Sequence, residues 1–132
     1  MQHGFLTIVT TVDGEESRFS CKAEMELSSL SALLRYHDGN AAVAISFLRE
    51  EVLIHRVGDY SMRLPLREGE QTKGTLTLAG NEGRLLAYTH KATYCIRKNA
   101  LLAQLHYVLD FGEEKQEMRL RINASMNSSE EK

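Results

Sequence analysis

The chain has 132 residues and a formal net charge of −2, from 16 lysine and arginine residues against 18 aspartate and glutamate residues. This length favours a single domain with one hydrophobic core. The apolar fraction of 42% and the charged fraction of 26% are typical of a folded soluble protein. A near-neutral balance lacks the broad basic field that binds a nucleic-acid backbone, and no apolar run approaches the roughly 18 residues of a membrane span. We therefore expect neither a nucleic-acid nor a membrane partner.

The start of the chain and its cysteines bear on the cellular compartment. Met1-Gln2-His3-Gly4 lacks the basic and apolar regions of a secretory signal. Cys21 and Cys95 are too few for a disulfide framework, and they stand too far apart, without a second pair, to form a metal-ligand set. The sequence therefore predicts a cytoplasmic protein with reduced thiols, no metal and no cofactor.

Alternation of apolar and polar residues is the main structural signal. From Arg18 to Leu27 every second residue is apolar, and the residues between are polar or charged. The runs Leu101–Phe111 and Met118–Ala124 repeat this pattern. Such alternation indicates a strand with one buried and one solvated face, which is typical of antiparallel sheets. The composition of Leu101–His106 would also permit a short helix.

Short polar clusters separate the alternating runs and set the faces of the strands. An even-length loop in an antiparallel hairpin keeps both flanking residues on one face, so the loop length predicts which side chains point inward. The count pairs residues across five turns: Phe111 with Gln116, Ile96 with Leu101, Tyr36 with Ala41, Val12 with Ser17, and Phe47 with Val52. Alternation also places five further residues on the inner face: Leu30, Leu78, Leu86, Tyr88 and His90.

The order of these elements predicts the architecture. About ten strands follow one another without a helix long enough for a crossover, which predicts an all-β fold, an up-and-down antiparallel meander of about 8–10 strands. Closure into a barrel removes the exposed edges of an open sheet of this size, and a sandwich is the alternative. We expect residues 1–124 to form a single β-barrel domain and residues 125–132, which have little to bury, to form a disordered tail.

A segment in the middle of the chain resembles a known family. Residues 52–62 read Val-Leu-Ile-His-Arg-Val-Gly-Asp-Tyr-Ser-Met, an apolar strand followed by Arg-x-Gly and a methionine four residues later. Further matching segments are Leu34-Arg35-Tyr36, Arg67-Glu68-Gly69 and Leu105–Leu109. From about Ile8 to Ile122 the chain resembles the YwiB-like family of small bacterial proteins, a domain of unknown function. The resemblance implies a lipocalin-like (calycin-like) barrel and no known reaction.

Arg56 is the most informative candidate residue. The strand face of Ile54 points Arg56 inward, and Met62 shares that face if residues 57–59 form an odd-length, bulged turn. A two-residue Gly58-Asp59 turn would instead point Arg56 outward. An inward guanidinium keeps its charge, and the predicted interior offers it no carboxylate. Backbone carbonyls at one end of the barrel, tyrosine oxygens, water, or a ligand carboxylate or phosphate would have to bond it.

The remaining candidates are aromatic and imidazole side chains. Alternation places His90 on the inner face, where a phenol or water would satisfy it, or where it would orient a ligand in an apolar cavity. No histidine has the partner spacing of a metal site, and neither cysteine has an adjacent base in the sequence. We therefore predict no catalytic or metal-binding residue. The predicted ligand-binding residues are Arg56, Tyr60, Tyr88, His90, Tyr94, Tyr36 and Tyr107.

These features leave three classes of function. The first is a binding module that holds a small apolar or anionic ligand in the barrel near Arg56. The alternative is a non-catalytic scaffold or protein-interaction module, in the form of a homodimer, that uses an apolar outer face. The residues of that face are Leu33, Ala42, Ala44, Leu48, Leu53 and Leu85. An enzyme comes third, because the sequence names no nucleophile, base and orienting group together.

Overall fold

The structure, a computed structural model, describes residues 2–126 and folds them into a closed barrel. Its ten strands are β1 (Gln2–Val12), β2 (Glu15–Leu27), β3 (Ala32–Asp38), β4 (Ala41–Phe47), β5 (Val52–Val57), β6 (Tyr60–Leu66), β7 (Gln71–Leu78), β8 (Asn81–Ile96), β9 (Ala100–Asp110) and β10 (Lys115–Met126). Each strand pairs antiparallel with the next, and β1 pairs with β10 to close the sheet. The predicted all-β meander and its closure are confirmed. β10 extends two residues past the predicted domain boundary, and the rest of the predicted tail lies outside the described residues.

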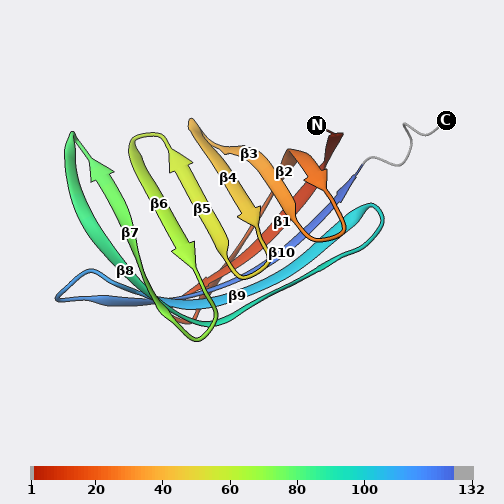
Figure 1. Cartoon of the computed structure of the whole chain (residues 1–132). Helices are drawn as coiled ribbons and strands as arrows, with labels where there is room; N and C mark the ends of the chain where they lie inside the picture. Colours follow the sequence, from red (N-terminus) through yellow and green to blue (C-terminus); the bar gives the residue numbers. More distant parts are fainter. Residues whose placement is uncertain (1, 127–132) are drawn as a thin grey trace.

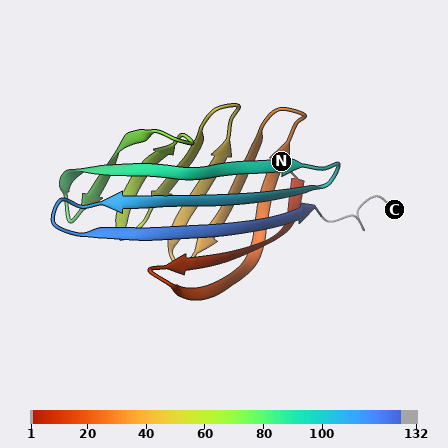
Figure 2. The same cartoon turned by 90° about the horizontal axis from the view of Figure 1, so that it is seen from below.

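The barrel has two groups of strands that differ in length. β3 to β7 have 6–8 residues each, whereas β1, β2, β8, β9 and β10 have 11–16. The short strands lie side by side in one layer with the first half of β8, and the second half of β8, β9 and β10 lie below them (Figure 1). Seen from below, these three long strands run across the short ones at a steep angle (Figure 2). The hydrophobic core fills the space between these two layers.

Alternation along the strands supplies this core. Twelve large inward side chains of the described residues are fully buried, and each contributes roughly 1.5–3 kcal/mol through the removal of apolar surface from water. They are Phe47, Leu6, Met25, Leu34, Ile45, Leu64, Leu66, Leu85, Leu101, Leu105, Ile122 and Val52.

The turn counts predicted the faces better than the registers. The pairs Ile96–Leu101 and Phe47–Val52 are confirmed. The other three hairpins are shifted by two residues, with the observed end pairs Val12–Glu15, Asp38–Ala41 and Asp110–Lys115. In two of them a glycine at positive φ, Gly14 or Gly39, permits a two-residue turn where a longer loop was predicted. A shift of two leaves every side chain on its predicted face.

A β-bulge in β8 overturns part of the predicted interior. The register shifts between Thr89 and Lys91, so the two halves of the strand have opposite phases. Leu86, Tyr88 and His90 therefore point outward, whereas the inward residues are Leu85, Ala87 and Thr89 before the bulge and Ala92, Tyr94 and Ile96 after it. Leu30 and Leu78, also predicted inside, are 70% and 57% exposed because they lie in a loop and at the last position of a strand.

The segment between β6 and β7 satisfies the backbone groups that the bulge takes out of the ladder. The Gly69 amide donates to the Thr89 carbonyl at 2.7 Å, and the Thr89 amide donates to the Glu70 carbonyl at 3.2 Å. The Ala92 amide donates to Oε1 of Glu68 at 2.8 Å. The bulge thus depends on a contact with a distant segment, because unpaired buried backbone groups are costly.

Candidate functional site

One end of the barrel is covered by its loops, and we call it the closed end. Here the strands are joined by residues 28–31, 48–51, 67–70 and 97–99. The Tyr94 ring packs 5.3 Å from the Phe47 ring. Its hydroxyl donates to the Leu48 carbonyl at 2.7 Å and lies 3.4 Å from the Leu30 carbonyl. Tyr94 therefore ties two of these loops to the core, so its hydroxyl is engaged in structure.

The other end, which we call the open end, has shorter connections. In four of its five connections only two residues lie outside the strands, at 13–14, 39–40, 58–59 and 79–80, and the fifth spans 111–114. Two-residue turns are too short to fold over the interior. Inward side chains near this end are accordingly only half-buried: Phe19, Cys21, Tyr36, Arg56, Tyr60, Met62, Leu76, Met118 and Leu120. Solvent reaches the core here, which makes this end the place where a ligand could meet inward side chains.

The β5–β6 hairpin places Arg56 inside the open end. The last pair of this ladder is Arg56 with Met62, which leaves the five residues 57–61 between them although only 58–59 lie outside the strands. This number is odd, as in the predicted bulged turn, so both side chains point inward. The Arg56 side chain is 16% exposed, and its guanidinium carbon lies 4.1 Å from the centroid of the Tyr60 ring. Nη2 donates to Oδ1 of Asp59 at 2.9 Å, whereas the buried Nε has no partner among the described residues. The sequence reading missed Asp59, because an exposed turn residue was not counted among the groups available to the interior.

Two phenols and a thiol complete the polar groups of the open end. Tyr36 packs 5.9 Å from the ring of Phe19, and Tyr107 is 3% exposed. Burial raises the pKa of Tyr36 well above its ordinary value of about 10, with Asp38 adding to the rise and Arg56 opposing it. Burial likewise raises the pKa of Tyr107. Both phenols therefore stay protonated at neutral pH, where they can donate hydrogen bonds.

The thiol of Cys21 is poorly suited to nucleophilic chemistry. Burial first, and then the Asp38 carboxylate, raise its pKa, so the reactive thiolate is disfavoured. Among the described residues, no group of three or more histidine, cysteine or acidic side chains is placed to hold a metal ion. The same part of the chain forms no helix capable of crossing a membrane.

The structure divides the seven predicted ligand residues among three places. Arg56, Tyr36, Tyr60 and Tyr107 gather at the open end, as described above. Tyr94 lies at the closed end, where it is bonded to loop carbonyls. Tyr88 and His90 lie on the outer wall, with ring centroids 4.8 Å apart. The prediction that these last two residues face the interior is wrong, because it extended one alternation through the bulge.

The outer wall instead brings His90 close to two residues that were not among the predicted ligand-binding residues. Its ring lies 4.8 Å from that of His106, whose Nε2 is 2.8 Å from Oε2 of Glu117. This hydrogen bond, assisted by Arg119, holds the pKa of the Glu117 carboxyl below its ordinary value. A sequence signal for the arrangement existed in the turn at 79–80. This turn has an even number of residues, which requires Leu85 to point inward, and the turn between Ile96 and Leu101 requires Tyr94 to point inward. Leu85 and Tyr94 are an odd number of residues apart, so both can point inward only if a bulge lies between them.

Comparisons with known proteins agree with this architecture. The fold defines a class, the closed antiparallel β-barrels. The chain belongs to the family described as "Domain of unknown function (DUF1934)", which matches residues 6–122. It is similar to the crystal structure of ywiB protein from Bacillus subtilis, with a TM-score of 0.81 and 17% sequence identity over 96% of this chain and 93% of that one. No curated protein matches the chain. The predicted YwiB-like resemblance is confirmed.

Proposed function

We propose that the protein is a binding module for a small amphipathic anion, held at the open end of the barrel. The observation that carries this proposal is the position of Arg56, a permanent charge that is 16% exposed among inward apolar and phenolic side chains. Such a charge is costly to bury unless acceptors surround it. Its one ion-pair partner in the described part of the chain is Asp59, whose side chain is 81% exposed and therefore binds it weakly.

The groups around Arg56 match the two parts of such a ligand. The unpartnered Nε and the protonated Tyr36 and Tyr107 hydroxyls are donors for a carboxylate. The half-buried Phe19 and Met62 offer apolar surface for its hydrocarbon part. A mostly apolar site with a few polar groups is the usual composition of a small-molecule site. We place the module in the cytoplasm, where Cys21 and Cys95, which form no disulfide, stay reduced.

A thermal-shift screen with fatty acids and aromatic carboxylic acids tests the proposal, because a ligand that binds only the folded state raises the unfolding midpoint. Arg56→Met should abolish the shift, since methionine keeps much of the stem volume without the charge. Arg35→Met, at an exposed arginine on β3, is the matched control and should retain it. Asp59→Asn should enlarge the shift by removing the competing carboxylate. The proposal fails if no compound shifts the wild type, or if Arg56→Met responds as the wild type does.

The alternative, a homodimer through the outer face of β3 to β5, rests on fewer residues than the sequence predicted. Leu85 is 1% exposed and lies inside the barrel. Leu48 remains 43% exposed, and Ala42 and Ala44 form the floor of a hollow that Arg35 and His55 also line. These charged and polar neighbours reduce the apolar area available for a self-contact. Light scattering at the dimer mass, together with the absence of any ligand shift, would favour this alternative.

A further inference from the structure

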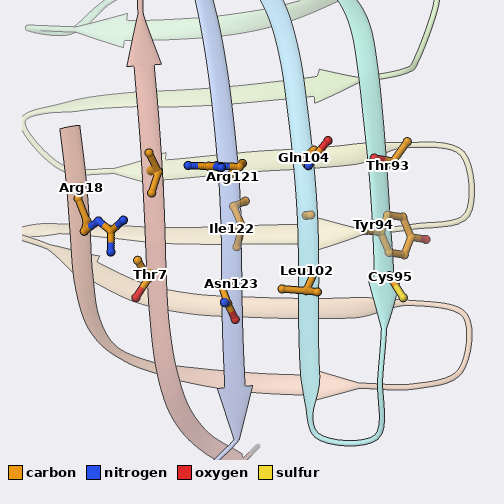
Figure 3. A pocket seen from close by; sticks show the side chains of 12 residues that line it. Thr7, Arg18, Thr93, Tyr94, Cys95, Leu102, Gln104, Arg121, Ile122 and Asn123 are labelled. Atoms are coloured by element: carbon orange, nitrogen blue, oxygen red, sulfur yellow. The ribbon is translucent and has the colours of Figure 1, made fainter. Parts of the chain in front are cut away.

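A second hollow lies on the outer wall, on the opposite side of the sheet from the core. It has a volume of about 610 Å³ and runs over β2, β1, β10, β9 and β8 (Figure 3). Its outward lining includes Arg18, Arg121, Gln104, Asn123, Thr7 and Thr93. The lining contains no aspartate or glutamate among the described residues. This hollow, which we call the arginine groove, is therefore rich in cations and hydrogen-bond donors, although the chain as a whole carries a net charge of −2.

The strand register sets two arginines on either side of one residue. Val9 pairs with Arg18 of β2 on one side and with Arg121 of β10 on the other. The two arginines are therefore two strand spacings apart, or roughly 10 Å between their backbones. Val9 is 8% exposed and forms the floor between them. Figure 3 shows both guanidinium groups leaning toward β1, the strand that separates them. An arginine side chain is long enough to bring both heads to one bound group.

This convergence of like charges lacks a counterion. Within residues 2–126 neither Arg18 nor Arg121 takes part in an ion pair. Two cations directed toward the same point repel each other, and both heads would otherwise be free to turn into solvent. An anion seated between them would convert this repulsion into two attractive contacts. The geometry therefore has the form of an anion site whose occupant bridges β2 and β10.

We propose that Arg18 and Arg121 bind a phosphate group over Val9, and that Gln104, Asn123 and Thr7 contact the polar molecule that carries it. A terminal phosphate presents three acceptor oxygens and a charge of about −1.5 to −2, so it can be bonded from two opposite sides. A carboxylate presents its two oxygens along one edge and serves one guanidinium best. The volume lies within the range of small-molecule sites, which suits a phosphorylated small molecule such as a nucleotide or a sugar phosphate.

Two other occupants fit the arginine groove less well. A second copy of the chain, related by a two-fold axis over this groove, would set the same unpaired arginines against each other. A nucleic-acid strand is held by a basic groove that also offers aromatic rings for base stacking. The aromatic residue that contributes to this lining is Tyr94, whose ring packs inside the barrel against Phe47. The groove thus supplies charge and hydrogen bonds without a stacking surface.

Titration calorimetry at fixed ionic strength tests the site with three probes: inorganic phosphate, a nucleoside monophosphate and a sugar phosphate. Arg18→Gln and Arg121→Gln should each weaken binding by about 10- to 100-fold, the loss expected for one charge-assisted contact. Both residues are exposed, so these variants should fold as the wild type does, which circular dichroism checks. Amide chemical-shift changes at Val9 and Gln104 of the wild type give a measurement that needs no variant. The three probes distinguish free phosphate from its carriers.

Two controls separate this site from other charges. Arg35→Gln, at an exposed arginine on β3 beside Glu24 of β2, should leave phosphate binding unchanged. Arg56→Met should also leave it unchanged, so the arginine groove and the open end succeed or fail independently. The proposal is overturned if no phosphate probe binds, or if Arg35→Gln weakens binding as much as Arg18→Gln does. It is also overturned if a glutamate-rich peptide binds through the same arginines more tightly than the phosphates, which would assign the groove to an acidic protein partner.

Discussion

Tyr94 and Tyr36 are inward tyrosines near opposite ends of the same barrel, and their surroundings give them different roles. At the closed end, four-residue loops bring the Leu48 and Leu30 carbonyls within reach of the Tyr94 hydroxyl. At the open end, the 39–40 turn that follows the strand of Tyr36 has only two residues and is too short to fold over the interior. Loop length thus decides whether an inward polar group stabilises the fold or stays available to a ligand. Four measurements test this difference between the two ends.

Truncation of a large ring at each end should produce the largest difference. Phe47 is fully buried at the closed end, so Phe47→Ala should cost about 3–5 kcal/mol through lost transfer energy and a residual cavity. Phe19 is half-buried near the open end, so Phe19→Ala should cost roughly half as much. Urea titration of both variants gives the two free energies of unfolding. Equal losses would show that the two ends are packed alike.

Alkaline unfolding should report the buried phenol near the open end. The pKa of Tyr107 is raised in the folded protein, so its contribution to stability is complete below the unfolded value of about 10 and is lost as the pH rises above it. Tyr107→Phe should therefore lose less stability than the wild type between about pH 10 and 12. Tyr88→Phe, which removes a hydroxyl from an exposed ring, is the control and should follow the wild-type profile. Parallel curves for all three proteins would refute the assignment.

Removal of the Tyr94 hydroxyl should loosen the closed end without emptying its core. Tyr94→Phe deletes the donor to the Leu48 carbonyl and should cost about 1 kcal/mol. Amide exchange in loops 28–31 and 48–51 should accelerate, because both loops lose their common tie to the core. Tyr36→Phe should leave exchange in these loops unchanged. Unaltered protection in Tyr94→Phe would mean that the loops hold the closed end by themselves.

Relief of strain in an open-end turn should give the smallest effect, a gain of about 0.5–1 kcal/mol. Ala79 has a φ of 54°, in the left-handed region that alanine adopts at a cost. Asparagine tolerates this region and precedes glycine in the favoured type of two-residue turn, so Ala79→Asn should raise the unfolding midpoint. Thermal unfolding measures the change. A lower midpoint for Ala79→Asn would show that the turn is not strained.

Local alternation and turn chemistry were sufficient to predict the meander, the closure and most inward side chains. The prediction tolerated three wrong registers because each error was a shift of two, which preserves the faces. It failed at His90 because the bulge depends on hydrogen bonds from residues 67–70, more than 18 positions away. It also missed the ion pair of Asp59 with Arg56, and it had no means to place Arg18 and Arg121 on either side of Val9. The first depends on the geometry of one turn and the second on closure of β1 against β10, which local patterns do not encode.

The pairing of the first and last strands also bears on how the chain could be rewired. Gly4 lies opposite Met126, so both ends of the described chain emerge side by side at the closed end (Figure 1). Proteins with neighbouring termini commonly tolerate circular permutation. A permutant with these ends linked and a new opening at the 39–40 or 79–80 turn would keep all ten strand pairings in a different chain order. Such a permutant would show that the barrel has no obligatory first strand, and that its architecture does not depend on where in the ring of strands the polypeptide begins.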